Sequence, residues 1–288
     1  MPEHSIAPEI RRAPRGMRWP GGQNVAVVFN VAYEVWSDGG VSAVGPMGNP
    51  LPPGVFDFNA DSYGRFGANA GVHRLIRGLD RAGIAADVFT SGALAERDPD
   101  RVRAIANAGH QIVGHGYAQN LVSPTLSAED DERYIRRTTE GLTGILGRRL
   151  DGWISPRATA GYDTIQRLIR NGYKWHADAL DDDLPYLQTF EAGKIVAIPL
   201  SIEFNDLSHA MRWGRTPRQF VEMFDEALSR LVANKDDVVI LDVLAHAHCY
   251  GRPAGAWAFA EIAESCAGRD DIWVTTRCRI AEHFLGLL

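Results

Sequence analysis

The sequence has few cysteines, no long apolar run and no block of basic residues. Its three cysteines, Cys249, Cys266 and Cys278, are too few for a disulfide framework in 288 residues, which favours a reducing, cytoplasmic location. No stretch is long and apolar enough to span a membrane, and the polar first 25 residues lack the apolar centre of a signal peptide. We therefore expect a cytoplasmic protein without a membrane partner.

Positive charge is also scarce. The net charge is −6 and the pI is about 5.8, and the only basic cluster, residues 11–18, is interrupted by Pro14 and Gly16. Nucleic acid is therefore not an expected partner. We predict that residues 1–24 form a surface arm and that residues 25–288 form a single domain, because 45% of the chain is hydrophobic and a chain of this length can bury a large core.

Most of the chain alternates between short apolar runs and amphipathic segments. The apolar runs predict strands at 27–36, 84–92, 110–116, 150–156, 194–201, 236–246 and 272–278. The amphipathic segments predict helices at 71–83, 93–109, 127–147, 161–173, 216–235, 255–268 and 279–288. Apolar strands that alternate with helices are typical of a parallel sheet covered on both faces, and seven or eight such units favour an α/β barrel.

Residues 37–64 interrupt this alternation with a long segment rich in Gly and Pro. A long loop inside a compact domain is usually functional. We expect this loop to close over a small-molecule substrate and to exclude bulk water. Its apolar residues Val55 and Phe56 would suit contacts between subunits.

A polar residue follows each of five predicted strands, at the end where barrel enzymes carry their working groups. We therefore expect these side chains to meet in one cavity. A carboxylate beside apolar barrel walls is expected to have a raised pKa, which would suit Glu34 to proton transfer. Each position also has a structural interpretation, such as a surface glutamate or a core histidine. The positions are Glu34, His115, Arg157, the pair Asn205 and Asp206, and the pair His246 and His248.

Four stretches that include these residues resemble the polysaccharide deacetylase (NodB-homology) superfamily. They are "VVFNVAYE", "GHQIVGHGY", "GWISPRATAGYDTIQRLIRNGYKWHAD" and "LAHAHCYGRPAGAWAF", in which His246 stands five residues before Gly251. The resemblance extends from about residue 18 to residue 284. It implies a distorted (β/α) barrel of seven or eight units, in agreement with the alternating pattern.

Departures from the family pattern indicate which branch of the superfamily is closest. Metal-dependent deacetylases hold zinc with one aspartate and two histidines, whereas this chain has no acid at Asn30 or Ala32 and has Gln119 four residues after His115. The closer resemblance is to the metal-independent PuuE-type allantoinases and cyclic imide hydrolases. It rests on "AYE", "HGY", "GWISPR", "DDLPY", "FND" and the histidine before "GRP".

This resemblance implies a hydrolase that cleaves the non-peptide C–N bond of a small cyclic amide, imide or ureide without a metal, as a tetramer or dimer. Such a reaction needs a base, an oxyanion donor and an acid for the leaving nitrogen. We expect Glu34 or His246 to be the base, and Arg157 or His115 to meet the oxyanion. Cys249 is expected to be a packing residue rather than a nucleophile.

The remaining strand-end residues are predicted to bind substrate. Asn205 would read a ring amide and Asp206 would orient His246 or Arg157. The other predicted substrate contacts are Tyr33, Trp36 and His248.

Two alternatives stay open. One is a metal-dependent carbohydrate N-deacetylase, because Glu34, His115, His246 and His248 together could supply the three ligands that a catalytic zinc needs. The other is a small-molecule binding protein that has lost catalysis.

Overall fold

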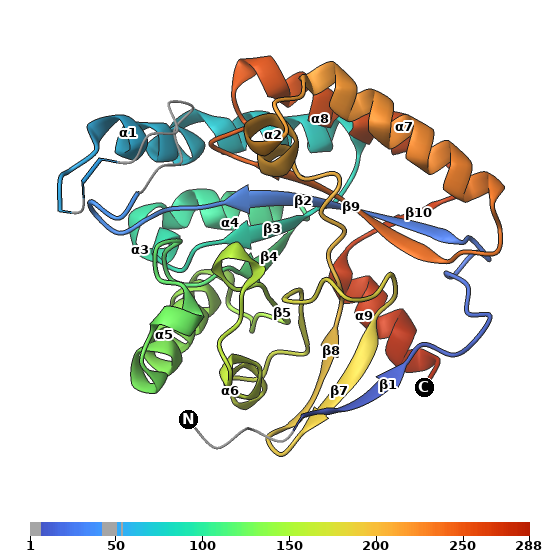
Figure 1. Ribbon diagram of the computed structural model, residues 1–288, viewed down its shortest axis with the longest axis horizontal. Helices are drawn as coiled ribbons and strands as arrows, with labels where there is room; N and C mark the ends of the chain where they lie inside the picture. Colours follow the sequence, from blue (N-terminus) through green and yellow to red (C-terminus); the bar gives the residue numbers. More distant parts are fainter. Residues whose placement is uncertain (1–6, 42–50, 53) are drawn as a thin grey trace.

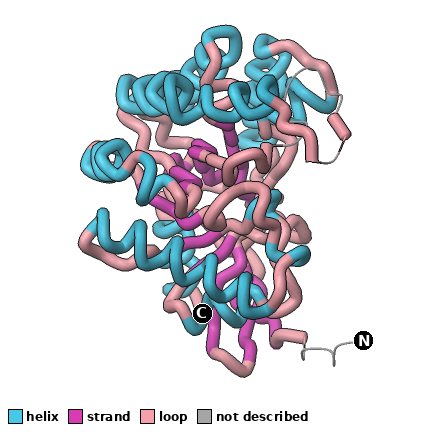
Figure 2. The backbone as a smooth tube through the Cα atoms, turned by 90° about the vertical axis from the view of Figure 1, so that its left-hand side faces the viewer, coloured by secondary structure: helices cyan, strands magenta, loops and turns pink. Residues whose placement is uncertain are grey.

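The computed structural model describes residues 7–41, 51–52 and 54–288. Its centre is a sheet of ten strands, with helices on the outside (Figures 1 and 2). Within the described ranges, no helix is long and apolar enough to cross a membrane. The strands are β1 (Glu9–Arg12), β2 (Val25–Tyr33), β3 (Asp87–Thr90), β4 (Gln111–Gly114), β5 (Gly152–Trp153), β6 (Trp175–His176), β7 (Tyr186–Phe190), β8 (Gly193–Ala197), β9 (Val239–His246) and β10 (Trp273–Thr275).

The helices mostly fall where amphipathic spacing predicts them. Ser127 caps α5 by accepting a hydrogen bond from Asp130 N at 3.1 Å, and Gly83 ends α2 in the left-handed conformation, with φ of 67°. The helices are α1 (Phe58–Phe66), α2 (Val72–Ala82), α3 (Leu94–Arg97), α4 (Pro99–Asn107), α5 (Ala128–Leu146), α6 (Thr164–Arg170), α7 (Pro217–Ala233), α8 (Pro253–Cys266) and α9 (Arg277–Gly286).

The parallel strands follow one another in the order β8, β6, β5, β4, β3 and β2, and both β9 and β10 pair with β2. Among the described strands, β8 and β9 do not pair. The segment after β8 reaches β9 through a bridge between Asn205 and Leu244 and through a hydrogen bond from Leu244 N to Phe204 O of 2.9 Å. The expected parallel sheet with helical crossovers is therefore present. The sheet curves round, but its hydrogen bonding is interrupted between β8 and β9.

The two long strands β2 and β9 divide their residues between two cores. Odd-numbered residues of both strands, from Val25 to Tyr33 and from Val239 to Ala245, join the outer core beneath the helices. Most even-numbered apolar residues join an inner core, to which Trp175 and Phe284 of α9 also belong. Side chains of a strand alternate between faces, so Glu34 and His246 lie on the inner side.

A buried ionic cluster occupies the middle of this inner side. Arg277, at the start of α9, is fully buried and donates hydrogen bonds to Asn30 Oδ1 and Asp242 Oδ1. Its backbone N–H donates to Asp87 Oδ2 at 2.9 Å. Asp87 and Asp242 need this cation, because a buried carboxylate without a partner would be strongly destabilising.

The predicted arm and three strands differ from expectation. Residues of the arm form β1, which pairs antiparallel with β7, and Trp19 is buried at 1% exposure. Strands β1, β6 and β7 were not predicted. The helix predicted at 93–109 is divided into α3 and α4 at Asp98, whose φ and ψ of −150° and 53° are not helical. Pro99 explains the break, because the residue before a proline is disfavoured in the helical conformation.

Candidate active site

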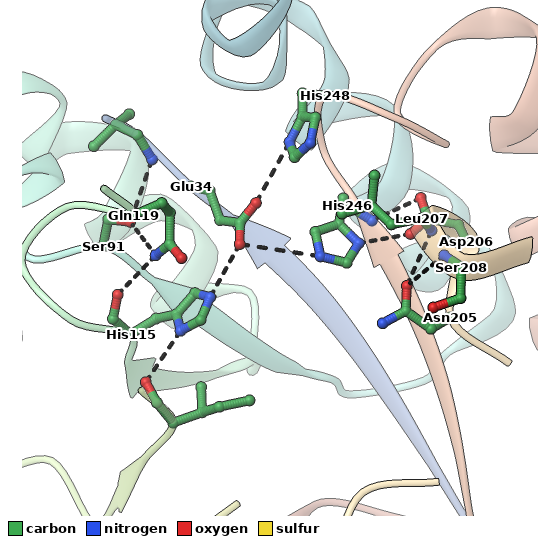
Figure 3. A network of polar contacts seen from close by, with 12 residues as sticks. Glu34, Ser91, His115, Gln119, Asn205, Asp206, Leu207, Ser208, His246 and His248 are labelled. Carbon is green, nitrogen blue, oxygen red and sulfur yellow. Dashed lines mark hydrogen bonds and ion pairs between the residues drawn. The ribbon is translucent and has the colours of Figure 1, made fainter. Parts of the chain in front are cut away.

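Glu34 is the centre of the polar group at the carboxyl ends of the strands (Figure 3). It follows β2 on the inner side and is 7% exposed. Its Oε1 lies 3.0 Å from His115 Nε2 and 4.0 Å from His246 Nε2, and its Oε2 lies 3.5 Å from His248 Nδ1. Three predicted site residues at the ends of β4 and β9 therefore surround one carboxylate. They are His115, His246 and His248.

The charge of Glu34 is set by these neighbours. Burial alone would raise the pKa of its carboxyl group, but the charge of His246 and the hydrogen bond from His115 outweigh burial and lower the pKa to about 2. The expectation of a raised pKa is therefore wrong. The reason is that apolar walls do not enclose the carboxylate; histidines do.

His115 holds Glu34 with a shared proton. Its Nδ1 donates to the carbonyl oxygen of Ile154 at 3.0 Å, so in the neutral ring Nε2 would carry no proton. Yet Nε2 lies at hydrogen-bond distance from Glu34 Oε1, and one proton has to lie between them. Because the pKa of Glu34 is low, its carboxylate is the acceptor in this contact. Both ring nitrogens of His115 are thus engaged, one with a backbone carbonyl and the other with Glu34.

His246 is fixed from behind by Asp206. The Asp206 carboxylate is completely buried, and its Oδ1 lies 2.6 Å from His246 Nδ1. Its Oδ2 accepts the backbone N–H groups of His246 and Tyr250, each at 2.9 Å. Burial lowers the pKa of His246, but Asp206 and Glu34 together raise it above its ordinary value. With Nδ1–H directed at Asp206, Nε2 faces Glu34 and is free to exchange a proton.

His248 is almost fully enclosed beside this pair. Its ring is 1% exposed and packs edge-on against Trp36 and Tyr63, with centroid distances of 5.2 and 5.8 Å. Burial lowers its pKa to about 4, so the imidazole is neutral at pH 7. Trp36 therefore takes part in the site by packing against the His248 ring.

Among the described residues, the side chains of Tyr33, Asn205 and Arg157 form no hydrogen bond or ion pair with the Glu34 carboxylate. Tyr33 faces the outer core, and its hydroxyl donates to Asp98 at 2.7 Å, which argues against the predicted role in substrate binding. Asn205 Oδ1 accepts the backbone N–H of Leu207 at 3.0 Å, so only its amide nitrogen remains for a ligand. The Arg157 side chain is exposed on a 3₁₀ turn, at a φ of 63°. In the part of the chain that the structure describes, its guanidinium has no hydrogen bond or ion pair, and its role stays a prediction.

Two polar residues of the site were not assigned a role from the sequence. Gln119 Nε2 donates to Ser91 Oγ at 3.1 Å and to the His115 carbonyl at 2.9 Å, and so supports the loop that carries His115. Ser91 directly follows β3, and this position after a strand is the signal that could have identified it.

The long loop is only partly described. Residues 42–50 and 53 lie outside the described residues, so the predicted closure over a ligand stays a prediction. Val55 and Phe56 are described and exposed, and their predicted contacts between subunits also stay a prediction. The described end of this segment, α1 and the π-helix Gly67–Gly71, packs against the turn after β9. A Cβ added at Gly71 would lie 1.8 Å from the carbonyl oxygen of Ala247. This close approach holds α1, with Tyr63, beside His248.

The arrangement does not fit a metal ion. Within residues 7–41, 51–52 and 54–288, no group of three or more His, Cys, Asp and Glu side chains has the geometry to hold one. Glu34 and His115 bond directly to each other, and the Gln119 amide nitrogen is engaged with Ser91 and the backbone. Asn30 is not at the site, since its amide is bonded to Asp242 deeper in the inner side.

Comparisons with known proteins show which family and which folds this chain is similar to. Residues 58–176 match the polysaccharide deacetylase family model. The fold is similar to a probable polysaccharide deacetylase from Pseudomonas aeruginosa PAO1, with a TM-score of 0.82 and 26% identity over 92% of both chains. It is also similar to the PuuE allantoinase, with a TM-score of 0.81 and 26% identity over 93% of this chain and 92% of the other. A peptidoglycan deacetylase from Helicobacter pylori is 25% identical over 54% of this chain, and the match spans 52% of that relative.

Proposed function

Because residues 58–176 of this chain belong to the polysaccharide deacetylase family and the fold is of the NodB type, we propose that the protein is a hydrolase of a small cyclic amide, imide or ureide. The observation that carries the proposal is the row formed by Asp206, His246, Glu34 and His115, in which a buried aspartate fixes one imidazole and a carboxylate fixes the other. Such a row holds a proton carrier, His246, beside the hydrogen-bonded pair of Glu34 and His115.

In the proposed reaction His246 Nε2 takes a proton from water while the water oxygen bonds to the substrate carbonyl carbon. The carbon–nitrogen bond then breaks, and the same proton passes to the leaving nitrogen. Asp206 stabilises the imidazolium that exists between these two steps. Both ring nitrogens of His115 are engaged with Ile154 and Glu34, so the predicted alternative, Arg157, would meet the oxygen on which negative charge develops. Because both carbon and nitrogen belong to one ring, the product is a single opened molecule.

Two observations favour a small substrate over a polymer. Glu34, His115 and His246 are each less than a tenth exposed, which suits a ligand that enters a confined site better than a chain that lies along a groove. The similarity to the PuuE allantoinase also extends over nearly the whole length of both chains. We propose that the enzyme works without a metal, since the described side chains do not form a metal site.

The second candidate is a metal-dependent N-deacetylase, which the names of the Helicobacter and Pseudomonas relatives favour. One experiment separates the two. The purified protein is dialysed against EDTA and assayed with allantoin, hydantoin, succinimide and an N-acetylated sugar, and products are identified by mass. We expect a cyclic substrate to gain the mass of one water at an undiminished rate. Release of acetate that is lost with EDTA and restored by zinc would show that the deacetylase is the correct function.

Two substitutions test the assignment within the cyclic hydrolase. Glu34→Gln keeps the shape of the side chain but removes the charge that holds His115, and His246→Ala removes the proton carrier. We expect each to lower kcat by about 100-fold or more. Arg12→Gln, at an exposed ion pair on β1, is the matched control and should leave kcat unchanged. If the two site variants alter only binding, with no turnover in the parent protein, the chain is a binding protein.

A further inference from the structure

His248 is the one imidazole of the site that has no hydrogen bond to its ring among the described residues. Both Nδ1 and Nε2 are buried without a hydrogen-bond partner, and the residue is 1% exposed. Buried polar atoms in native proteins nearly always have partners, because leaving them unpaired opposes folding. A histidine with two unpaired nitrogens therefore indicates a missing ligand.

The packing around His248 shows that the ring is firmly held. Trp36, Tyr63 and His246 each contact it edge-on, with interplanar angles of 81°, 73° and 71°. Arg252 donates from Nε to the His248 carbonyl at 3.1 Å, and its guanidinium stacks on the Tyr63 ring at 4.3 Å. Several aromatic and backbone contacts thus fix an imidazole whose nitrogens bond to none of them.

The direction of the ring defines what the ligand must offer. His248 Nδ1 lies 3.5 Å from Glu34 Oε2, which is too far for a good hydrogen bond. Within the described structure Oε2 accepts no hydrogen bond, since His115 occupies only Oε1. The neutral imidazole has one donor nitrogen and one acceptor nitrogen. A charged acceptor therefore lies next to an unused imidazole donor.

A cyclic amide or imide carries the complementary pair. Its ring N–H is a donor, and the adjacent carbonyl oxygen is an acceptor on the same edge of the ring. An N–H directed at Glu34 Oε2 would place that carbonyl beside the imidazole. Substitution on the nitrogen removes the donor and adds bulk beside Glu34 Oε2 and the His248 ring, which packs against Trp36 and Tyr63.

We propose that His248 is a specificity-determining residue that, together with Glu34 Oε2, recognises the unsubstituted N–H and adjacent C=O edge of the ring substrate. The inference rests on the proposed function and narrows its substrate class. His248 and Glu34 would together select ureides and imides with a free ring N–H, such as hydantoin and succinimide, and would reject their N-substituted forms.

The test compares matched ligands on matched variants. Binding of succinimide and N-methylsuccinimide is measured by calorimetry on the parent protein and on His248→Phe, which keeps the aromatic ring and removes both nitrogens. We expect the parent to prefer succinimide by about tenfold or more, because only succinimide offers the N–H to Glu34, and we expect His248→Phe to bind succinimide about tenfold more weakly than the parent, because the ring carbonyl loses its partner. His248→Gln, which restores a donor and an acceptor, should recover part of that affinity. His283→Phe, on α9, is the control and should bind as the parent does.

The outcomes are distinct from those of the proposed function. Equal affinity of the parent for the two imides, or an unchanged affinity for succinimide in His248→Phe, would overturn the role of His248 even if the rings are hydrolysed. An affinity for succinimide that depends on His248 without any turnover would support this inference and refute the hydrolase. If His248→Phe does not fold, His248→Leu, which also lacks both ring nitrogens, replaces it, and an unchanged affinity for succinimide there would overturn the inference.

Discussion

Substitution of Asp206 by asparagine tests the geometry on which the proposed chemistry depends. Asp206 Oδ2 receives two backbone N–H groups, so the carbonyl oxygen of an asparagine must take that position. The amide nitrogen then faces His246 Nδ1, where Asp206 Oδ1 now lies at 2.6 Å. A donor at this place forces the proton of the neutral imidazole from Nδ1 to Nε2. His246 could then no longer accept a proton from water.

The size of each effect follows from these contacts. The loss of one buried, charge-assisted hydrogen bond should lower the free energy of unfolding by about 1.5–3 kcal/mol. Asp206→Ala leaves two buried N–H groups without acceptors, so it should cost about 2–6 kcal/mol. For activity, a wrong imidazole tautomer in a comparable Asp–His pair lowers kcat about 10⁴-fold. Asp206→Asn should therefore fold and be nearly inactive.

Two measurements check this reasoning. Urea denaturation gives the order of stability, with the parent above Asp206→Asn and Asp206→Ala lowest. Titration of the His246 imidazole by NMR, identified by its absence in His246→Ala, should show a pKa above the ordinary value in the parent and a lower pKa in Asp206→Asn, because the negative charge that raises it is gone. The acid limb of kcat/KM should follow the parent pKa. An unchanged titration, or full turnover in Asp206→Asn, would refute the Asp206–His246 arrangement.

Three further predictions concern stability. Between pH 6.5 and about 4 the unfolded chain binds a proton at His248 that the folded chain does not, so acid should lower the free energy of unfolding by about 3 kcal/mol in this range, and a pH series on His248→Phe should lack that loss. Arg277→Met leaves two buried aspartates without their cation and should cost about 3–5 kcal/mol in urea denaturation, whereas Arg279→Met, from an ion pair whose arginine is 70% exposed, should cost about 1 kcal/mol or less. Equal effects of the two arginines would contradict the buried cluster. Gly71→Ala should destabilise the protein and weaken ligand binding, because its Cβ would meet a backbone carbonyl, while Gly144→Ala, in the exposed part of α5 with open space around it, should be neutral or stabilising by about 1 kcal/mol.

The sequence predicts the fold well where periodicity is strong. Helix α5 has a capping serine, an acidic first turn and nineteen residues of helical spacing, and it lies where predicted. Strands β5 and β6 have only two residues each; β5 lies within the apolar run that predicts a strand at 150–156, whereas β6 has no such run around it and was missed. Strand β7 was missed because its burial falls from buried to intermediate along its length, as expected of a strand near the edge of a sheet.

The sequence predicts which residues form the candidate site, but it does not predict their charge states. The position of a polar residue after a strand is enough to bring Glu34, His115 and His246 together. The pKa of Glu34 depends on which atoms of its neighbours face it, and spacing does not contain that information. Tyr33 could have been placed correctly, because it shares the odd-numbered face of β2 with Val25 and Phe29.

The same alternation explains why this barrel tolerates so much buried charge. On the inner side of β2 and β9, polar residues occur at Asn30, Glu34, Asp242 and His246, and the apolar residues between them separate two polar levels. In the lower level Arg277 bonds to both Asn30 and Asp242, and among the described residues its Nε and Asp87 Oδ1 have no hydrogen-bond partner. The upper level, around Glu34, is left open at Oε2 and at His248. The ion pairs of the lower level hold their charges together beneath the site, whereas at the upper level both ring nitrogens of His248 stay unpaired beside the Glu34 carboxylate, which supports the proposal that a ligand binds at the upper level.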